Sequence, residues 1–153
     1  MVVVTSQKSV TVRIGEDMSR DYIFRGFHPD ENGSKTITLN GKKIKGEWVE
    51  GNLFIAEEKE YYEIVEGNKI VRIHHNVIPE TVGLWTGHTD ASKTKIFDGD
   101  RVILNDNFDE VYTGEWDNDI ACFVIEGNGV SYVFDNVRDD EIEVIGNKWE
   151  VEG

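Results

Sequence analysis

VGLWTGHTDASKTKIFDGDRV, residues 82–102, contains the turn and strand signals that decide the fold of this chain. An apolar run ends at Trp85, and the polar, short-chained residues 90–95 that follow are typical of an exposed loop. Gly99 predicts a tight turn, because glycine adopts positive φ without steric cost. Residues 101–104 then predict a second strand. This order of strand, protruding loop, tight turn and strand occurs in small SH3-like barrels and in other β folds.

Short strand patterns separated by turn residues continue on both sides of this stretch. Asn40-Gly41 predicts a type I′ hairpin turn, and residues 50–52 predict a second turn. Residues 57–66 fit either one or two helical turns or part of a hairpin, and we favour the hairpin. Alternating or β-branched apolar residues predict strands over residues 2–4, 10–14, 22–27, 36–39, 43–49, 53–55, 61–65, 69–74, 111–116, 120–125, 130–134 and 144–146.

These patterns predict an all-β protein, in which an N-terminal β-meander is followed by a small SH3-like barrel. We expect an N-terminal extension over residues 1–20, the meander lobe over residues 21–79 and the barrel lobe over residues 80–149. The chain has 153 residues, of which 39% are hydrophobic and 10% aromatic. This composition suffices for one domain, or for two small lobes with a packed core.

The sequence also limits where the protein acts. No apolar run approaches the length of a transmembrane helix, and residues 1–20 lack the pattern of a secretory signal peptide. The single cysteine, Cys122, excludes an intramolecular disulfide and fits a reducing compartment. We therefore expect a cytoplasmic protein with no membrane partner. Cys122 lies in an apolar strand pattern, which favours a buried thiol over a nucleophile.

The net charge of −14 is concentrated in the second half of the chain. Residues 1–80 contain 11 Lys and Arg against 13 Asp and Glu, a net charge of −2. Residues 81–153 contain 5 against 17, a net charge of −12. A field of this sign repels phosphate backbones and favours basic partners. The simpler interpretation is that the acidic surface keeps the protein soluble.

Four segments carry motifs: YIFRGF (22–27), GEWVEG (46–51), TVGLWTG (81–87) with KIFDGDRV (95–102), and EVIGN (143–147). Together, and in this order, they resemble the YopX family of phage and prophage proteins. The resemblance spans about residues 22–149, and it implies an all-β protein with an SH3-like barrel in its C-terminal part. It implies no enzyme activity, because no biochemical role is established for the family.

Two segments depart from the family pattern. The loop pattern L-x-D-x-x-G is replaced by residues 88–94, which contain no glycine, and the family's tail is replaced by residues 148–151. A function carried by the loop or the tail is therefore not transferred. The motif positions that we expect to be structural or binding residues are Trp48, Gly51, Trp85, Thr86, Gly87, Phe97, Gly99, Asp100 and Gly146. The candidate partner loop contributes His88, Asp90, Lys93 and Lys95.

The sequence contains no recognisable catalytic, metal or cofactor motif. A phosphate-binding loop, a dinucleotide fingerprint and a nucleophile elbow are all missing from it. His74 and His75 are adjacent in a predicted strand and would point to opposite faces, so they cannot chelate one ion. We therefore expect no enzyme activity, no bound metal and no cofactor. Trp48 and Trp116 are predicted to be core residues.

Two classes of function remain. The first is a protein-interaction module in the cytoplasm of a bacterial host, whose partner is another protein or a second copy of the chain. Its contact surfaces would be the loop of residues 88–95 and the acidic C-terminal face. The second is an acidic mimic of nucleic acid that inhibits a DNA-binding protein. Direct nucleic-acid binding through Lys42, Lys43 and Lys45 is not expected, because these lysines also suit a solvated strand edge.

Overall fold

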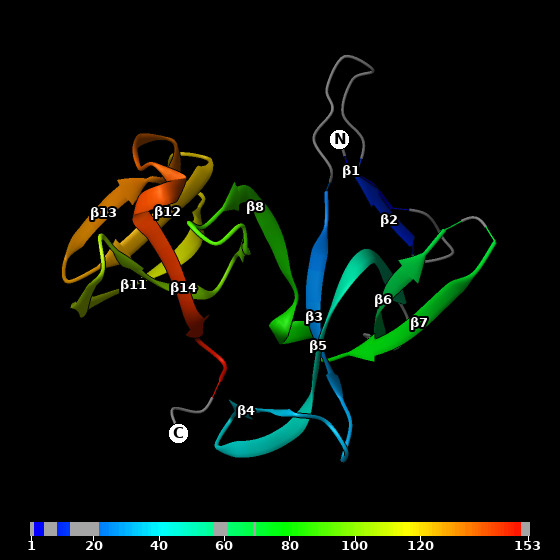
Figure 1. Cartoon of the computed structure of the whole chain (residues 1–153). Helices are drawn as coiled ribbons and strands as arrows, with labels where there is room; N and C mark the ends of the chain where they lie inside the picture. Colours follow the sequence, from blue (N-terminus) through cyan, green and yellow to red (C-terminus); the bar gives the residue numbers. More distant parts are fainter. Residues whose placement is uncertain (1, 5–8, 13–21, 57–60, 69, 151–153) are drawn as a thin grey trace. The chain divides into compact units, whose positions relative to one another are not determined.

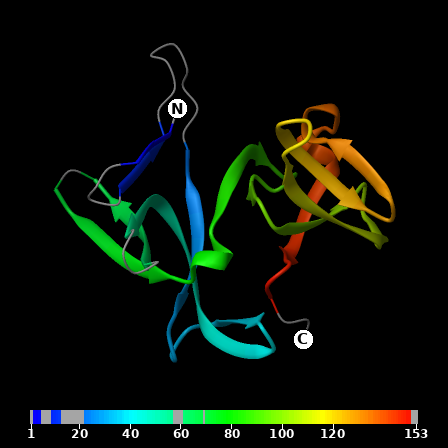
Figure 2. The same ribbon diagram turned by 180° about the vertical axis from the view of Figure 1, so that it is seen from behind.

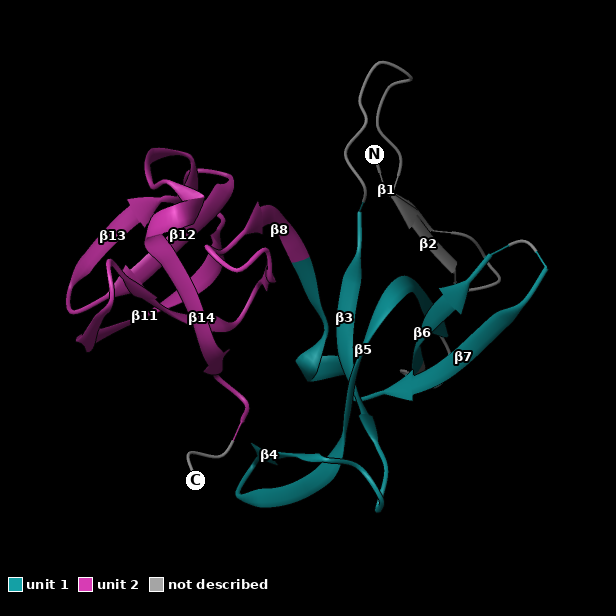
Figure 3. Cartoon of the chain, viewed as in Figure 1, with its two compact units in different colours: residues 1–84, 151–153 teal, residues 85–150 magenta. Residues whose placement is uncertain are grey.

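The computed structural model describes residues 2–4, 9–12, 22–56, 61–68 and 70–150, and these residues form strands, turns and three short 3-10 helices. Because no α-helix occurs in these ranges, the all-β prediction is confirmed. The chain forms two compact units (Figure 3): the first contains residues 1–84 and 151–153, and the second contains residues 85–150. The chain passes from one to the other inside β8. The lobe limits predicted from the sequence stay a prediction.

The first unit is organised around one long strand, β5, which pairs with four others (Figures 1 and 2). Antiparallel partners of β5 are β2, β3, β4 and β6, while β7 extends the sheet beyond β6. The 3-10 helix η1 (Pro79–Thr81) precedes β8. The strands are β1 (Val2–Val4), β2 (Ser9–Val12), β3 (Phe24–Pro29), β4 (Lys35–Leu39), β5 (Lys42–Ala56), β6 (Tyr61–Gly67), β7 (Arg72–Val77) and β8 (Gly83–Thr89).

β5 runs without interruption through residues 50–52, so the turn predicted there is wrong. Gly51 pairs with Phe24 of β3, and the next residue, Asn52, pairs with Val65 of β6. A Cβ atom on Gly51 would lie 2.3 Å from the carbonyl oxygen of Val65, so glycine lets β6 approach closely. The strand therefore bends and changes partner at Gly51 instead of ending.

Other local predictions in the first unit are confirmed. Asn40 and Gly41 form the tight turn between β4 and β5, with φ values of 51° and 79°. Residues 61–67 form the strand β6, as the hairpin interpretation required, while residues 57–60 lie outside the described residues. The predicted strand over residues 10–14 is described only to Val12, the last residue of β2.

The main core cluster of the first unit is formed by side chains of the neighbouring strands β5, β6 and β7. Its buried side chains are Val49, Leu53, Ile64 and Val77. Trp48 is half-buried beside this core, because it packs edge-on against the buried Phe27, with 5.0 Å between ring centroids. The prediction that Trp48 is a core residue therefore holds only in part.

The second unit is a five-stranded antiparallel sheet in the order β13-β12-β11-β10-β14. In the described pairings β13 and β14 each have one strand partner, so the sheet is not closed into a barrel, and the SH3-like closure is not confirmed. Its elements are β9 (Lys95–Phe97), β10 (Asp100–Leu104), β11 (Asn107–Asp117), β12 (Cys122–Gly127), β13 (Val130–Val133), η2 (Phe134–Asn136), η3 (Asp139–Glu141) and β14 (Ile142–Asn147).

Trp116 is a correction to the predicted core. It is 46% exposed, because it lies at the end of β11, where its indole N–H donates to Asn118 Oδ1 at 2.9 Å. Cys122 is half-buried rather than buried. The buried side chains of this unit include Ile96, Phe97, Val102, Ile103, Ile125, Phe134 and Ile142.

Phe97 offers a direct test of this core. The side chain is 1% exposed, so Phe97→Ala is expected to lower the free energy of unfolding by about 3–5 kcal/mol, through lost burial and the cavity left behind. Phe108→Ala is the matched control, because Phe108 is 69% exposed, and it should change stability by less than about 0.5 kcal/mol. Urea denaturation followed by tryptophan fluorescence measures both. Equal effects would contradict the packing.

Candidate functional site

The buried carboxylate of Asp90 organises the loop between β8 and β9. Its Oδ1 accepts the main-chain N–H groups of Ser92 at 2.8 Å and Thr94 at 2.9 Å. Its Oδ2 accepts the N–H of Val144, from β14, at 3.1 Å. Asp90 is only 3% exposed, so the expectation that the whole loop is exposed is wrong at this residue. Its carboxylate is occupied by main-chain donors, as buried carboxylates usually are.

The same loop covers the free edge of the sheet. Besides the bond from Val144 to Asp90, the N–H of Ala91 donates to the carbonyl oxygen of Ile142 at 2.9 Å. An uncovered edge strand would leave these groups open to pairing with another chain. Residues 91–94 of the loop that covers this edge are exposed to solvent.

Lys93 adopts a conformation that suits glycine. Its φ is +69°, in the left-handed region. In the family's loop pattern, L-x-D-x-x-G, the aspartate corresponds to Asp90 and the glycine to Lys93. The loop that looked like a departure therefore retains both the aspartate and the left-handed backbone, with lysine in the glycine position.

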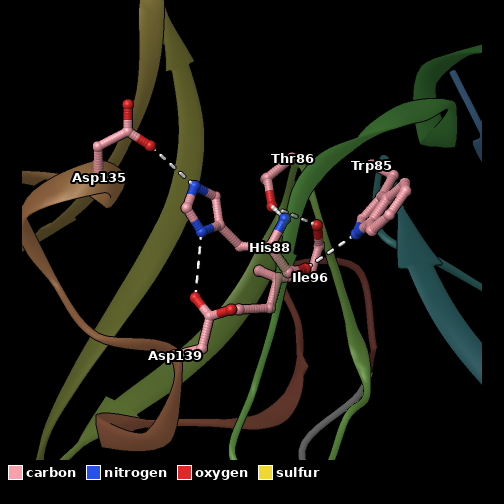
Figure 4. Close-up of polar contacts among 6 residues, drawn as sticks. All are labelled: Trp85, Thr86, His88, Ile96, Asp135 and Asp139. Atoms are coloured by element: carbon pink, nitrogen blue, oxygen red, sulfur yellow. Dashed lines mark hydrogen bonds and ion pairs between the residues drawn. The ribbon is translucent and has the colours of Figure 1, made fainter. Parts of the chain in front are cut away.

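His88 holds the segment after β13 against β8 (Figure 4). Its Nδ1 lies 3.1 Å from Asp139 Oδ1, and its Nε2 lies 3.1 Å from Asp135 Oδ1. The ring also stacks on Phe134, with centroids 5.3 Å apart. A doubly protonated imidazole would donate to both carboxylates at once. The half-buried His88 side chain therefore connects β8 to the two 3-10 helices η2 and η3.

Two motif residues that precede His88 fix the end of β8. Thr86 Oγ1 donates to the carbonyl oxygen of Ile96 at 2.8 Å, and the indole N–H of Trp85 donates to the carbonyl oxygen of His88 at 2.8 Å (Figure 4). The Lys95 ammonium lies 5.9 Å from the Trp85 ring centroid. Gly87, between Thr86 and His88, is exposed and has a φ of +89°.

The D-G-D motif builds the turn between β9 and β10. Asp100 Oδ2 accepts the N–H of Phe97 at 2.7 Å. Gly99 has a φ of +95°; its N–H donates to Gly114 and its carbonyl accepts from Lys148, both at 2.8 Å. The motif thus joins the turn to β11 and to the segment after β14.

Asn147, which follows the motif residue Gly146, ends β14 and holds the segment after it through side-chain hydrogen bonds. Asn147 is buried, and its Oδ1 accepts the N–H groups of Trp149 at 3.0 Å and Glu150 at 3.1 Å. Asn147 lies within the motif of residues 143–147 but is not among the site residues predicted from the sequence. The most visible signal was its place directly after a glycine at the end of a strand.

An acidic hollow of about 430 Å³ lies beside the exposed part of the loop. Four carboxylates line it, and Arg138 lies close to them, with 2.6 Å between Arg138 Nη2 and Asp140 Oδ2. We call this feature the acidic hollow. It is lined by Ala91, Ser92, Asn105, Asp106, Asp140, Glu141, Ile142 and Glu143.

The walls of the acidic hollow come from three separate segments. Asn105 and Asp106 form the β10–β11 turn with φ values of +53° and +58°, and the N–H of Asn105 donates to the carbonyl oxygen of Glu141 at 2.7 Å. The net charge of residues 81–153 predicted an acidic face, but no local pattern places Asp140, Glu141 and Glu143 beside residues 91–92. Only the long-range contacts of β14 bring these segments together.

His74 and His75 lie on opposite sides of β7, as expected. His75 Nε2 lies 3.0 Å from Glu66 Oε2, whereas His74 Nδ1 lies 3.6 Å from Glu63 Oε1. Across the described ranges, no three His, Cys, Asp or Glu side chains gather in a way that could hold a metal ion. Among the same residues, no helix is long and apolar enough to span a membrane.

Asp90 can be tested by removing its carboxylate. Asp90→Ala is expected to lower the free energy of unfolding by about 2–4 kcal/mol, because three N–H donors lose a charged acceptor. Asp90→Asn should cost less, since its one remaining oxygen still accepts. Asp119→Ala, at an exposed carboxylate, serves as the control. A loss below about 1 kcal/mol for Asp90→Ala in urea denaturation would show that the loop is held by other contacts.

Lys93 allows the opposite test. Left-handed backbone costs a non-glycine residue about 1–2 kcal/mol, and glycine avoids this cost. Glycine also lowers stability by about 0.4–1 kcal/mol, because it increases the conformational entropy of the unfolded chain. Lys93→Gly should therefore raise the free energy of unfolding by about 0.5–1 kcal/mol. Lys93→Ala, which keeps the strain, should not. If alanine stabilises the protein as much as glycine does, the backbone is not the reason.

A model of the YopX family, described as YopX protein, matches residues 23–151. The matched region contains almost all of the described first unit and the whole second unit, including the Asp90 loop and the D-G-D turn. Neither the curated proteins nor the solved structures gave a match to this chain. Because the match covers most of the chain and agrees with the motifs in order, the chain belongs to the YopX protein family.

Proposed function

We propose that this protein is a non-catalytic protein-interaction module whose contact face is the acidic hollow together with residues 91–94. The observation that carries the proposal is the hollow itself: four carboxylates gathered from two segments beside an exposed, hydrogen-bonded loop. Such a face suits a basic segment of another protein, because complementary charge steers the encounter and fixes the register.

The charge around the acidic hollow supports a basic partner. Residues 102–137 contain no Lys or Arg. Arg138 is therefore the first basic residue in the chain after Asp106 of the acidic hollow. Its side chain is 76% exposed and pairs with Asp140 and Glu141. Exposed ion pairs contribute only about 0–1 kcal/mol, so an incoming Lys or Arg can exchange with Arg138 at little cost.

The fixed loop supports binding with a small entropic cost. Side chains and loops that must be ordered on association reduce affinity. Here Asp90 and the edge of β14 already hold the main chain of residues 91–94 through hydrogen bonds. The backbone positions that carry the exposed side chains of this loop are therefore fixed before a partner binds. Lys93 is one of them, although it is not among the residues that line the acidic hollow.

The proposal includes the absence of catalysis and a cytoplasmic setting in a bacterial host. The residues that line the acidic hollow include no His, Cys or Lys, so a mechanism that uses one of these side chains as base or nucleophile has no support there. The phage and prophage setting rests on the family resemblance. The half-buried Cys122 is consistent with a reducing compartment.

A charge-reversal pair tests the contact face. Asp140→Lys with Glu143→Lys should reduce the amount of partner retained from bacterial lysate at least tenfold, because it reverses the charge of the acidic hollow. Asp119→Lys with Glu126→Lys is the matched control: it makes the same net change at exposed carboxylates outside the hollow. Retention on tagged protein is measured by mass spectrometry. The proposal is wrong if the hollow variant retains the same partner as the wild type.

A second candidate is the nucleic-acid mimic, favoured by the net charge of −12 over residues 81–153. A mimic binds through exposed charge spread over a surface, so binding should fall steeply with salt. Both charge-reversal pairs should then weaken retention of a DNA-binding protein to a similar degree. A partner that is lost only from the hollow variant, and not from the control pair, favours the interaction module instead.

A further inference from the structure

The β4–β5 hairpin extends beyond the end of β3 and leaves one edge of β5 open (Figure 1). β3 and β4 lie on opposite edges of β5, because Gly46 pairs with Pro29 on one side and with Lys35 on the other. Pro29 is the last residue of β3, whereas β4 continues beside β5 as far as Lys42. Among the described strands, none lies beside residues 42–44 on the β3 side. This part of the edge is therefore open to a strand from another molecule.

The turn of the hairpin determines which main-chain groups face the open edge. Residues 40–41 both have positive φ and join β4 directly to β5. In such a two-residue hairpin the pair that closes the turn is hydrogen-bonded, and bonded pairs then alternate along the strands. The N–H and C=O of Lys43, one position beyond the closing pair, therefore point away from β4. The main chain of Lys45 faces the same edge, where its carbonyl oxygen accepts the N–H of Asp30 at 2.9 Å.

The chain leaves this edge directly after Asp30. The carbonyl oxygen of Asp30 accepts the N–H of Gly33 at 2.9 Å, and its Oδ1 accepts the N–H of Asn32 at 2.9 Å. This turn passes close over β5, since a Cβ atom on Gly33 would lie 2.3 Å from the carbonyl oxygen of Gly46. It leaves a cavity of about 380 Å³, which we call the hairpin cavity. The cavity is lined by Pro29, Asp30, Glu31, Lys43, Ile44 and Lys45.

The hairpin cavity has a charged side and an apolar side. Because successive side chains of a strand point to opposite faces, Lys43 and Lys45 lie on one face of β5 and Ile44 lies on the other. Pro29 belongs to the face of Ile44, since it pairs with Gly46. A strand that enters the cavity therefore meets ammonium groups on one face and apolar surface on the other.

The pairing already present on this edge favours an acidic residue opposite Lys43. Asp30 occupies the position opposite Lys45, whereas no acidic residue of the described strands is paired with Lys43. Opposite charges at directly paired positions stabilise antiparallel strands. Glu31 acts against this preference on the loop side of the cavity. Residues 30–45 nevertheless contain four Lys against two acidic residues, a net charge of +2 in a chain whose net charge is −14.

We propose that the hairpin cavity binds an extended segment of a partner protein as an added antiparallel strand. The segment carries an acidic residue opposite Lys43 and apolar residues on either side of it. Its main chain continues the line of β3 and exchanges hydrogen bonds with the N–H and C=O of Lys43. In strand addition of this kind, main-chain hydrogen bonds supply affinity and alternate side chains supply specificity.

The open main chain favours a peptide over a nucleic acid as the ligand. Phosphates could contact the lysines, but a nucleic acid backbone has no N–H and C=O groups at the spacing of a β-strand to pair with Lys43. The hairpin cavity also shares no residue with the acidic hollow. The inference therefore goes beyond the proposed function and does not depend on it.

A capped synthetic peptide tests the proposal on the full chain. The probe is acetyl-Thr-Val-Glu-Val-Thr-amide, and binding is followed by the amide chemical shifts of the protein. The probe should shift the Lys43 amide signal most. An analogue with Gln in place of Glu should bind about threefold more weakly, because an exposed ion pair is lost. An analogue with Lys at that position should bind more weakly still. A Lys analogue that binds as tightly as the probe would overturn the proposal.

Methylated peptides test the main-chain hydrogen bonds without changing the protein. Methylation of the Glu nitrogen removes the donor that reaches the carbonyl oxygen of Lys43, and it should weaken binding about fivefold. Methylation of the next Val nitrogen is the matched control, because that nitrogen points away from β5 in the added strand. Equal affinities of the two methylated peptides would show that the segment does not bind as a strand.

Substitutions of the protein test the position of the acidic residue. Lys43→Gln should weaken binding of the probe about threefold and leave binding of its Gln analogue unchanged. Lys42→Gln is the matched control, because it removes the same charge from the opposite face and outside the cavity lining. Glu31→Gln should strengthen binding, since it removes a like charge. If the two lysine variants lose the same affinity, the acidic residue is not opposite Lys43.

Two further results separate this inference from its alternatives. If single-stranded oligothymidylate shifts the amides of Lys42, Lys43 and Lys45 and the probe shifts none of them at millimolar concentration, the lysines contact phosphate and the peptide proposal is wrong. The variant Asp140→Lys with Glu143→Lys should bind the probe like the wild type. Loss of probe binding from that variant would contradict a separate site, whereas an unchanged lysate partner with no probe binding overturns only this inference.

Discussion

The second unit depends on the burial of one carboxylate. Asp90 joins the loop after β8 to β14, although Asp90 and Val144 are far apart in the chain. Because a buried carboxylate must have its oxygens satisfied, the loop main chain and the β14 edge have to be in place together. This requirement fixes the loop, covers the sheet edge and forms one wall of the acidic hollow.

Local signals predicted the turns well, because the residues that form them need no distant partner. Asn40, Gly41 and Gly99 have the positive φ values that these turns require. The strand content and the family followed from periodicity and from motifs in order. The errors occurred where a distant segment decides the outcome. Gly51 looked like a turn residue, but its role is to let β6 approach β5.

The candidate site shows the same division between local and long-range information. The sequence identified the loop of residues 88–95 and the acidic character of the C-terminal half. It placed Asp90 in solvent, because a short polar run gives no sign that β14 will supply an N–H donor. The acidic hollow could not be predicted for the same reason. Its carboxylates come from the β10–β11 turn and from the segment of η3 and β14, which meet only in the folded unit.

The way in which the loop is fixed has a consequence for how the protein can change. The hydrogen bonds that hold residues 91–94 come from their main chain and from Asp90. The exposed side chains at these positions can therefore be replaced while the anchoring bonds are kept. Point substitutions alone can therefore vary the chemistry of this exposed surface, and an engineer could randomise these positions as a small library on a constant scaffold.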